Sequence, residues 1–114
     1  MTMSIIETFE NMLAKGQDST LLRFGLGQAY FKEEQFDKAI EHFLKTIEHD
    51  RNYSAAWKLL GKAYTAIDKT EKAIETFSDG IEIAEANGDI QAAKEMRVFL
   101  KRLQKNEQNS SVSN

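Results

Sequence analysis

Residues 6–9 read "IETF", residues 40–43 read "IEHF", and residues 74–77 read "IETF" again. The three segments begin 34 residues apart, so one phrase recurs at a fixed period along the chain. A fixed period of about 20–50 residues is the signature of a repeat architecture, in which each unit is one supersecondary motif stacked on the next. The motif that fills 34 residues therefore decides the fold.

The two central periods, residues 20–53 and 54–87, share eleven identical positions when one is laid over the other. Most of these positions are apolar or small, and they fall at helical spacing. In the second half of the first period, Ile40, Phe43 and Ile47 recur at i, i+3 and i+7, which puts them on one helix face. Each period is therefore predicted to hold two helices joined by a turn.

This pattern resembles the tetratricopeptide repeat family, whose unit is a helix–turn–helix of about 34 residues. The match is carried by the large apolar and the small residues of both periods: Trp57, Leu60, Gly61, Tyr64, Ala73 and Phe77, and Leu26, Gly27, Tyr30, Ala39 and Phe43. Arg23 stands at the family's tryptophan position, and Glu34 and Asp68 replace a turn glycine. The resemblance implies an all-α fold, a right-handed α-solenoid of antiparallel helix pairs.

The two ends of the chain depart from complete repeats. Residues 5–18 align with the second helix of the unit, and Ser4 with Glu7 makes a capping box, so we expect an N-terminal half-repeat helix over residues 4–18. Residues 89–105 carry an apolar helix face that is shifted in phase, which predicts a capping helix. The residues of that face are Ile90, Ala93, Met96, Leu100 and Leu103. Residues 106–114 are polar and are predicted to be a disordered tail.

A single domain over residues 1–105 with about six helices is therefore expected, with full repeats at 20–53 and 54–87. The predicted helices lie near residues 4–15, 19–33, 36–49, 53–67, 70–86 and 89–105.

Composition narrows the function classes. A net charge of −3 with 41% hydrophobic and 29% charged residues is typical of a soluble globular protein. The chain has no cysteine, which excludes disulfides and thiolate metal sites. No apolar run approaches the roughly 18 residues that a membrane span needs. The first residues also lack the pattern of a signal peptide, so a cytoplasmic location is expected. Aromatic residues are not interleaved with a sustained basic stripe, so nucleic acid is not an expected partner.

The sequence contains no recognisable catalytic constellation. Its two histidines, His42 and His49, lie seven residues apart, whereas a helical zinc pair more often lies four apart with a third ligand elsewhere. We interpret them as solvated histidines on the outer surface. There is no glycine-rich phosphate loop, and Ser78–Asp79 and Ser110–Ser111 have no histidine nearby in sequence. The prediction is a protein without catalytic residues, metal site or cofactor, and so not an enzyme.

The resemblance implies that the first helices of successive repeats line a concave groove. It places there, from the first period, Leu21, Phe24, Gln28, Phe31 and Lys32, and from the second, Ala55, Lys58, Lys62 and Thr65. Lys58 and Lys62 lie one turn apart and point the same way. A groove with an aromatic wall and a basic wall suits a peptide with apolar side chains and carboxylates. The alternative is that the lysines form a solvated face and the two phenylalanines belong to the core.

Some members of the family hold a C-terminal carboxylate with a clamp of lysine, arginine and asparagine. Phe24 and Gln28 occupy the lysine and asparagine places of that clamp, so its pattern is not met here.

A second candidate surface is the open edge of the N-terminal helix. Complete repeats carry a small residue where their own first helix crosses, but the half-repeat has Ile5 and Met12 at these places. We predict an apolar strip there that accepts a helix from a partner or from a second copy. The alternative is that two exposed apolar side chains have no function.

The leading interpretation is a protein–protein interaction module, an adaptor that binds a peptide or protein segment in its concave groove without chemistry of its own. The alternative is a structural subunit or homo-oligomer that assembles through the open N-terminal edge. A monomer or a weak homodimer is expected in solution.

Overall fold

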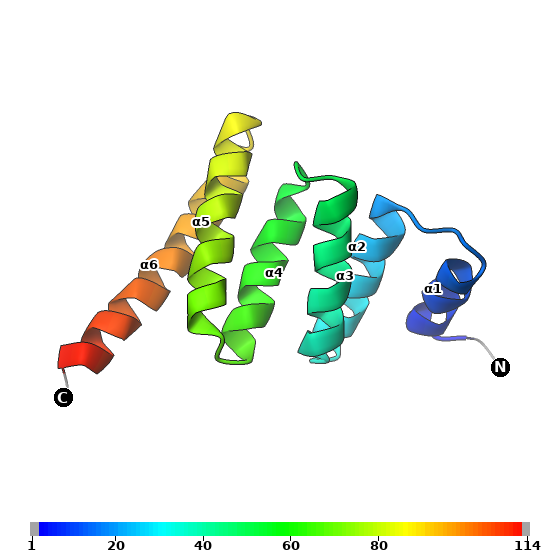
Figure 1. Ribbon diagram of the computed structural model, residues 1–114, viewed down its shortest axis with the longest axis horizontal. Helices are drawn as coiled ribbons and strands as arrows, with labels where there is room; N and C mark the ends of the chain where they lie inside the picture. Colours follow the sequence, from blue (N-terminus) through cyan, green and yellow to red (C-terminus); the bar gives the residue numbers. More distant parts are fainter. Residues whose placement is uncertain (1–2, 113–114) are drawn as a thin grey trace.

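The computed structural model describes residues 3–112, and this part of the chain forms six α-helices and no strand (Figure 1). The helices are α1 (Ile5–Ala14), α2 (Thr20–Lys32), α3 (Phe36–His49), α4 (Ser54–Ala66), α5 (Thr70–Ala86) and α6 (Ile90–Val112). They stand in a row that measures 53 × 33 × 19 Å. The predicted all-α solenoid with about six helices is confirmed.

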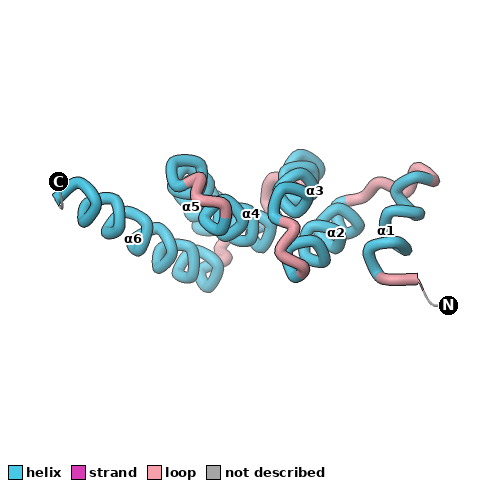
Figure 2. The backbone as a smooth tube through the Cα atoms, turned by 90° about the horizontal axis from the view of Figure 1, so that it is seen from below, coloured by secondary structure: helices cyan, strands magenta, loops and turns pink. Residues whose placement is uncertain are grey.

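Each helix packs against its neighbour in the chain, and α2 with α3 and α4 with α5 form two helix pairs. The pairs stack so that α2 also contacts α4, and α4 contacts α6. In the described part of the chain, α1, α3 and α5 make no such backbone contact with one another. The helices α2, α4 and α6 therefore form the inner side of the row, with α3 and α5 on the other side (Figure 2).

A glycine of the first helix faces a phenylalanine of the second helix in both full repeats. A Cβ atom built on Gly27 would overlap the ring of Phe43, and one built on Gly61 would overlap the ring of Phe77. Both rings are completely buried. Only glycine lets the two backbones approach closely enough to enclose such a ring, which explains why these positions are identical in the two repeats.

Four helices are each followed by a residue whose backbone is in the left-handed conformation. These residues are Gly16, Glu34, Asp68 and Gly88. After α2, the N–H of Gln35 donates to the carbonyl oxygen of Tyr30 at 2.9 Å, as in a Schellman motif. Glu34 and Asp68 have φ angles of 59° and 60°, a conformation that costs a residue with a side chain about 1–3 kcal/mol. The turns keep their geometry without the family's glycine because these hydrogen bonds hold them.

The C-terminal helix differs from the prediction. It does not end at residue 105, and the predicted disordered tail is wrong for residues 106–112, which continue α6; residues 113–114 lie outside the described part. No glycine or proline follows residue 89, so nothing in this segment stops a helix. Of its predicted apolar face, Ala93, Met96 and Leu103 are buried and Leu100 is partly buried. Ile90 is 54% exposed, because the first turn of α6 lies at the end of its contact with α5.

Candidate functional site

A pocket of about 370 Å³ opens on the inner side of the row, between α4 and α6. We call it the α4–α6 pocket. Its floor consists of buried or partly buried apolar residues, Phe77 from α5 and Phe99 and Leu103 from α6. Its rim carries polar side chains that are more exposed: Lys62, Thr65, Arg102 and Asn106. An apolar floor with a few polar groups around it is the common form of a binding site.

Two cations lie beside one aromatic ring in this pocket. The Lys62 Nζ atom is 5.2 Å from the ring centre of Phe99, and the Arg102 Cζ atom is 5.8 Å from the same centre. Lys62 also lies 6.0 Å from the ring centre of Phe31 on α2, so it spans from the first repeat to the capping helix. Cations at these distances are attracted by the ring face, typically by about 0.5–1 kcal/mol at exposed sites.

The other lysine predicted for the groove, Lys58, has a partner. Its Nζ atom donates to Glu95 of α6 at 2.7 Å, and Gln91 donates to the same carboxylate at 3.3 Å. The hydrogen bond from Lys58 lowers the pKa of Glu95, and its charge acts in the same direction. Lys58 therefore joins α4 to α6, and the two predicted groove lysines are not equivalent.

The remaining predicted groove residues divide between core and surface. Phe24 is buried, with its ring centre 4.7 Å from that of Tyr53 and 5.9 Å from that of Phe43, as the alternative interpretation expected. Leu21 is 73% exposed, although it is a large apolar residue. Phe31 is partly buried and meets Phe36 edge-on. The others are exposed polar residues, Gln28, Lys32 and Thr65, and the partly buried Ala55.

Four inner-side residues of α6 were not predicted as site residues. Glu95, Phe99, Arg102 and Asn106 follow one another at i, i+4, i+7 and i+11, which is the spacing of one helix face. That periodicity is present in the sequence, but the phase-shifted apolar face of the segment predicts only a cap. The helix that closes the solenoid also supplies half of the α4–α6 pocket.

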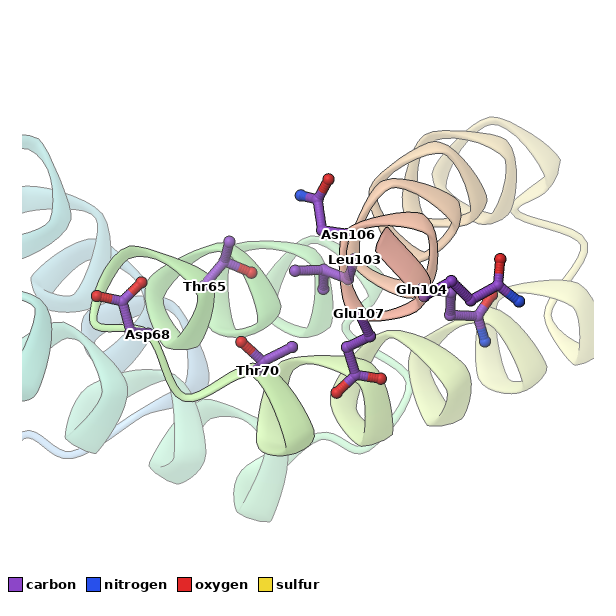
Figure 3. A pocket seen from close by; sticks show the side chains of 8 residues that line it. Thr65, Asp68, Thr70, Leu103, Gln104, Asn106 and Glu107 are labelled. Atoms are coloured by element: carbon purple, nitrogen blue, oxygen red, sulfur yellow. The ribbon is translucent and has the colours of Figure 1, made fainter. Parts of the chain in front are cut away.

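A wider hollow of about 1030 Å³ adjoins the α4–α6 pocket at the turn between α4 and α5 (Figure 3). Leu103 of α6 points toward α4 in this view, and Asp68 and Thr70 border the hollow on the side of the turn. Thr65 and Leu103 line both spaces. The α4–α6 pocket and the wider hollow are therefore neighbours, with Lys62 on the far side of the pocket from the turn.

At the N-terminal end, a buried histidine connects three helices. His42 of α3 is only 6% exposed and stacks on the ring of Tyr30 with centres 5.5 Å apart. Its Nε2 lies 3.5 Å from a carboxylate oxygen of Glu10 on α1, and its Nδ1 lies 3.2 Å from an N–H group of Arg23 on α2. Tyr30 also donates to Glu10 at 3.0 Å. The interpretation of His42 as a solvated outer histidine is wrong.

Arg23 replaces the family's tryptophan, and it extends this network to the loop before α2. Two of its nitrogens donate to Asp18 at 2.8 and 2.9 Å, and His49 of α3 lies 3.1 Å from the same carboxylate. The hydrogen bonds from Arg23 hold the pKa of Asp18 well below its usual range. Arg23 is thus linked to two histidines of α3, to His42 directly and to His49 through Asp18.

Stability should depend on pH through His42. Burial lowers the pKa of His42 and Arg23 acts in the same direction, while Glu10 and Glu41 oppose the shift. The pKa of a histidine in the unfolded chain is about 6.5, and the pKa of His42 in the folded protein is lower. As the pH falls through the range between these two pKa values, the unfolded state therefore binds more protons than the folded state. We expect the free energy of unfolding, measured with urea, to fall from about pH 7.5 to about pH 5.5.

The variant His42→Gln is a close control, because an amide can accept from Arg23 and donate to Glu10 without titrating. Its free energy of unfolding should vary less over the same pH range. An equal pH dependence in the wild type and in His42→Gln would contradict the assignment.

The open edge of α1 is partly as predicted. Ile5 is 61% exposed, and Met3 just before the helix is also exposed. Met12, however, is partly buried against the core. The predicted strip of Ile5 and Met12 is therefore exposed mainly at its N-terminal end.

A row of helix pairs whose first helices share an inner side defines a helical-repeat protein. Residues 21–53 and residues 54–87 each match the tetratricopeptide repeat family. The chain belongs to this family. Tetratricopeptide repeat proteins are generally non-enzymatic modules that mediate protein–protein interaction.

Similar proteins are found in several organisms. The TPR repeat-containing protein PA0015 of Pseudomonas aeruginosa is 48% identical over 99 residues, which cover 87% of this chain and 94% of that protein. The solution structure of protein BPP2914 from Bordetella parapertussis is 40% identical, with a TM-score of 0.83 over 93% of this chain and 92% of the other. The TPR2B domain of yeast Sti1, solved as a complex with pHsp70, has a TM-score of 0.80 at 19% identity, covering 89% of this chain and 81% of the other. At that identity the likeness concerns the fold alone.

Neither a membrane-spanning helix nor a cluster of three metal-ligating side chains is present in the described residues. None of the helices found there is both long and apolar enough to cross a membrane. No three histidine, aspartate or glutamate side chains of the described residues lie close enough together to hold a metal ion.

Proposed function

We propose that this protein is a non-enzymatic adaptor that binds a peptide or protein segment along the inner side of α2, α4 and α6. The α4–α6 pocket carries the proposal, because it is an apolar recess of about 370 Å³ that opens on the inner side of the row. Pockets of about 300–1,000 Å³ with an apolar lining and a few polar groups are the usual form of ligand sites.

Exposed apolar surface on α2 supports a binding surface longer than the pocket. Leu21 is among the most exposed large apolar residues. The Lys62 ammonium lies near the rings of both Phe31 on α2 and Phe99 in the pocket. Gln28 and Lys32 add polar groups on the same helix. An extended or helical segment could thus contact both repeats and the capping helix. A short surface of this kind suggests an affinity near micromolar, about −8 kcal/mol.

The test is an affinity capture from a lysate, followed by mass spectrometry and by titration of the recombinant captured protein. An inner-side variant with Phe31→Ala and Lys62→Glu is compared with an outer variant with Leu44→Ala and Lys45→Glu. The outer pair likewise truncates one large apolar side chain to alanine and reverses the charge of one lysine, at two exposed residues of α3. We expect that the wild type and the outer variant capture the same protein. The affinity of the inner-side variant for that protein should be at least about tenfold weaker. Circular dichroism checks that all three proteins are folded.

Identical captures by the wild type and the inner-side variant would contradict this proposal. They would favour the second candidate, assembly through the edge of α1, for which the exposure of Ile5 and Met3 is the supporting observation.

A further inference from the structure

The two cations of the α4–α6 pocket differ from Lys58 of α4 and Arg97 of α6, each of which has a carboxylate partner. Lys58 is paired with Glu95 at 2.7 Å, and Arg97 on the same capping helix is paired with Glu85. Among the side chains that the structure describes, neither Lys62 nor Arg102 has a carboxylate oxygen within 4.0 Å of a side-chain nitrogen. Glu95 is close enough for its pKa to respond to Lys62, but its hydrogen bonds go to Lys58 and Gln91.

These two cations stand over an apolar floor. They flank the ring of Phe99 at 5.2 and 5.8 Å, and Phe77 and Leu103 lie beside it. Two like charges around one ring repel each other, and the partial burial of Lys62 weakens the screening by solvent. An anion between them would remove that repulsion and gain charge-assisted hydrogen bonds. The floor would at the same time cover an apolar group attached to that anion.

We propose that the α4–α6 pocket is the anchoring subsite of the inner side, and that it takes an apolar peptide side chain together with an adjacent carboxylate. This inference rests on the proposed function and assigns a chemistry to its ligand. Lys62 and Arg102 pair with the carboxylate, Phe99 and Leu103 contact the apolar side chain, and the amide of Asn106 offers a further donor at the rim. The apolar floor and the volume of about 370 Å³ favour a peptide over an inorganic anion.

This subsite does not use the positions of the family's clamp, since Phe24 is buried and Gln28 lies on α2, away from the pocket lining. Half of its residues belong to the C-terminal part of α6, which continues as a helix beyond Arg102. The capping helix therefore acts both as a closure of the solenoid and as a wall of the subsite.

The experiment uses an array of short synthetic peptides with one central phenylalanine or leucine flanked by glutamate, glutamine or lysine. Each peptide is made with a free and with an amidated C-terminus, which separates a terminal carboxylate from a side-chain carboxylate. Binding to the full chain is measured by fluorescence polarisation for the wild type, Arg102→Glu and Lys101→Glu. Lys101 is the matched control, because it is an exposed neighbour on α6 that does not line the pocket.

We expect the wild type to prefer glutamate-flanked peptides over their glutamine counterparts. Arg102→Glu should weaken this binding by about tenfold or more, and Lys101→Glu by less than about twofold. The double variant Lys62→Glu and Arg102→Glu should shift the preference to lysine-flanked peptides.

Equal binding of glutamate and glutamine peptides by the wild type would overturn the subsite, as would equal losses in Arg102→Glu and Lys101→Glu. If the wild type in that case still captures a lysate protein that the variant with Phe31→Ala and Lys62→Glu loses, the proposed function stands and only the subsite fails. If neither peptides nor a lysate partner depend on the inner side, both proposals fail.

Discussion

Replacing Trp57 by alanine should lower the free energy of unfolding by about 3–5 kcal/mol. Trp57 is buried in α4, and its Cβ lies against Gly80 of α5. Its indole N–H donates to the carbonyl oxygen of Arg51 at 2.8 Å. Loss of the ring leaves a cavity that the rigid helix pair can only partly close. Since small domains have only about 5–15 kcal/mol of stability, the loss should be evident in urea denaturation followed by circular dichroism.

The variant Trp57→Phe serves as the control for this prediction. It keeps an aromatic ring in the core but loses the hydrogen bond to Arg51, and should cost about 1 kcal/mol for that bond, with a smaller contribution from the reduced volume. A loss below about 1 kcal/mol in Trp57→Ala would contradict the burial of this ring.

Replacing Phe77 by alanine should have an effect of similar size, about 3–5 kcal/mol. Phe77 is buried between α4 and α5, fills the space that Gly61 leaves open, and stacks on Phe99 with ring centres 5.6 Å apart. Its loss removes contacts from α5 to both α4 and α6.

The companion variant Gly61→Ala should also destabilise the protein. Overpacking costs about 1–3 kcal/mol, and the better helix propensity of alanine returns at most about 1 kcal/mol. In the double variant with Phe77→Ala, the new methyl group occupies part of the vacated volume. The combined loss should therefore be clearly smaller than the sum of the two single losses, and strict additivity in urea denaturation would contradict the contact.

The packing positions of the repeats were predictable because they recur. Gly27 with Phe43 and Gly61 with Phe77 stand 34 residues apart in the chain and perform the same task, so one comparison of the sequence with itself identifies them. Periodicity alone could not separate core from surface within the inner side. Phe24 and Phe31 were both expected to face the groove, but Phe24 turns between Tyr53 and Phe43.

Pairings between distant, non-repeating residues could not be predicted. Lys58 pairs with Glu95 because the capping helix has its own phase relative to the repeats, and that phase is a result of packing against α5. The burial of His42 depends on Glu10 from one helix and Arg23 from another. The end of α6 departs from the prediction for a different reason. Its polar composition indicates disorder, but the segment contains no helix-breaking residue.

The first helix has a consequence for the dynamics of the protein. None of the residues of α1 is fully buried, and the helix is attached by partly buried apolar side chains and by the bonds of Glu10. The apolar side chains are Ile6, Phe9, Met12 and Leu13. In a linear array each helix is held only by its neighbours, so a terminal unit can detach by local unfolding while the others remain folded. Hydrogen exchange of the amides in α1 would then follow such local opening rather than global unfolding. The inner side from α2 to α6 can therefore stay intact and competent for recognition while the N-terminal helix opens and closes.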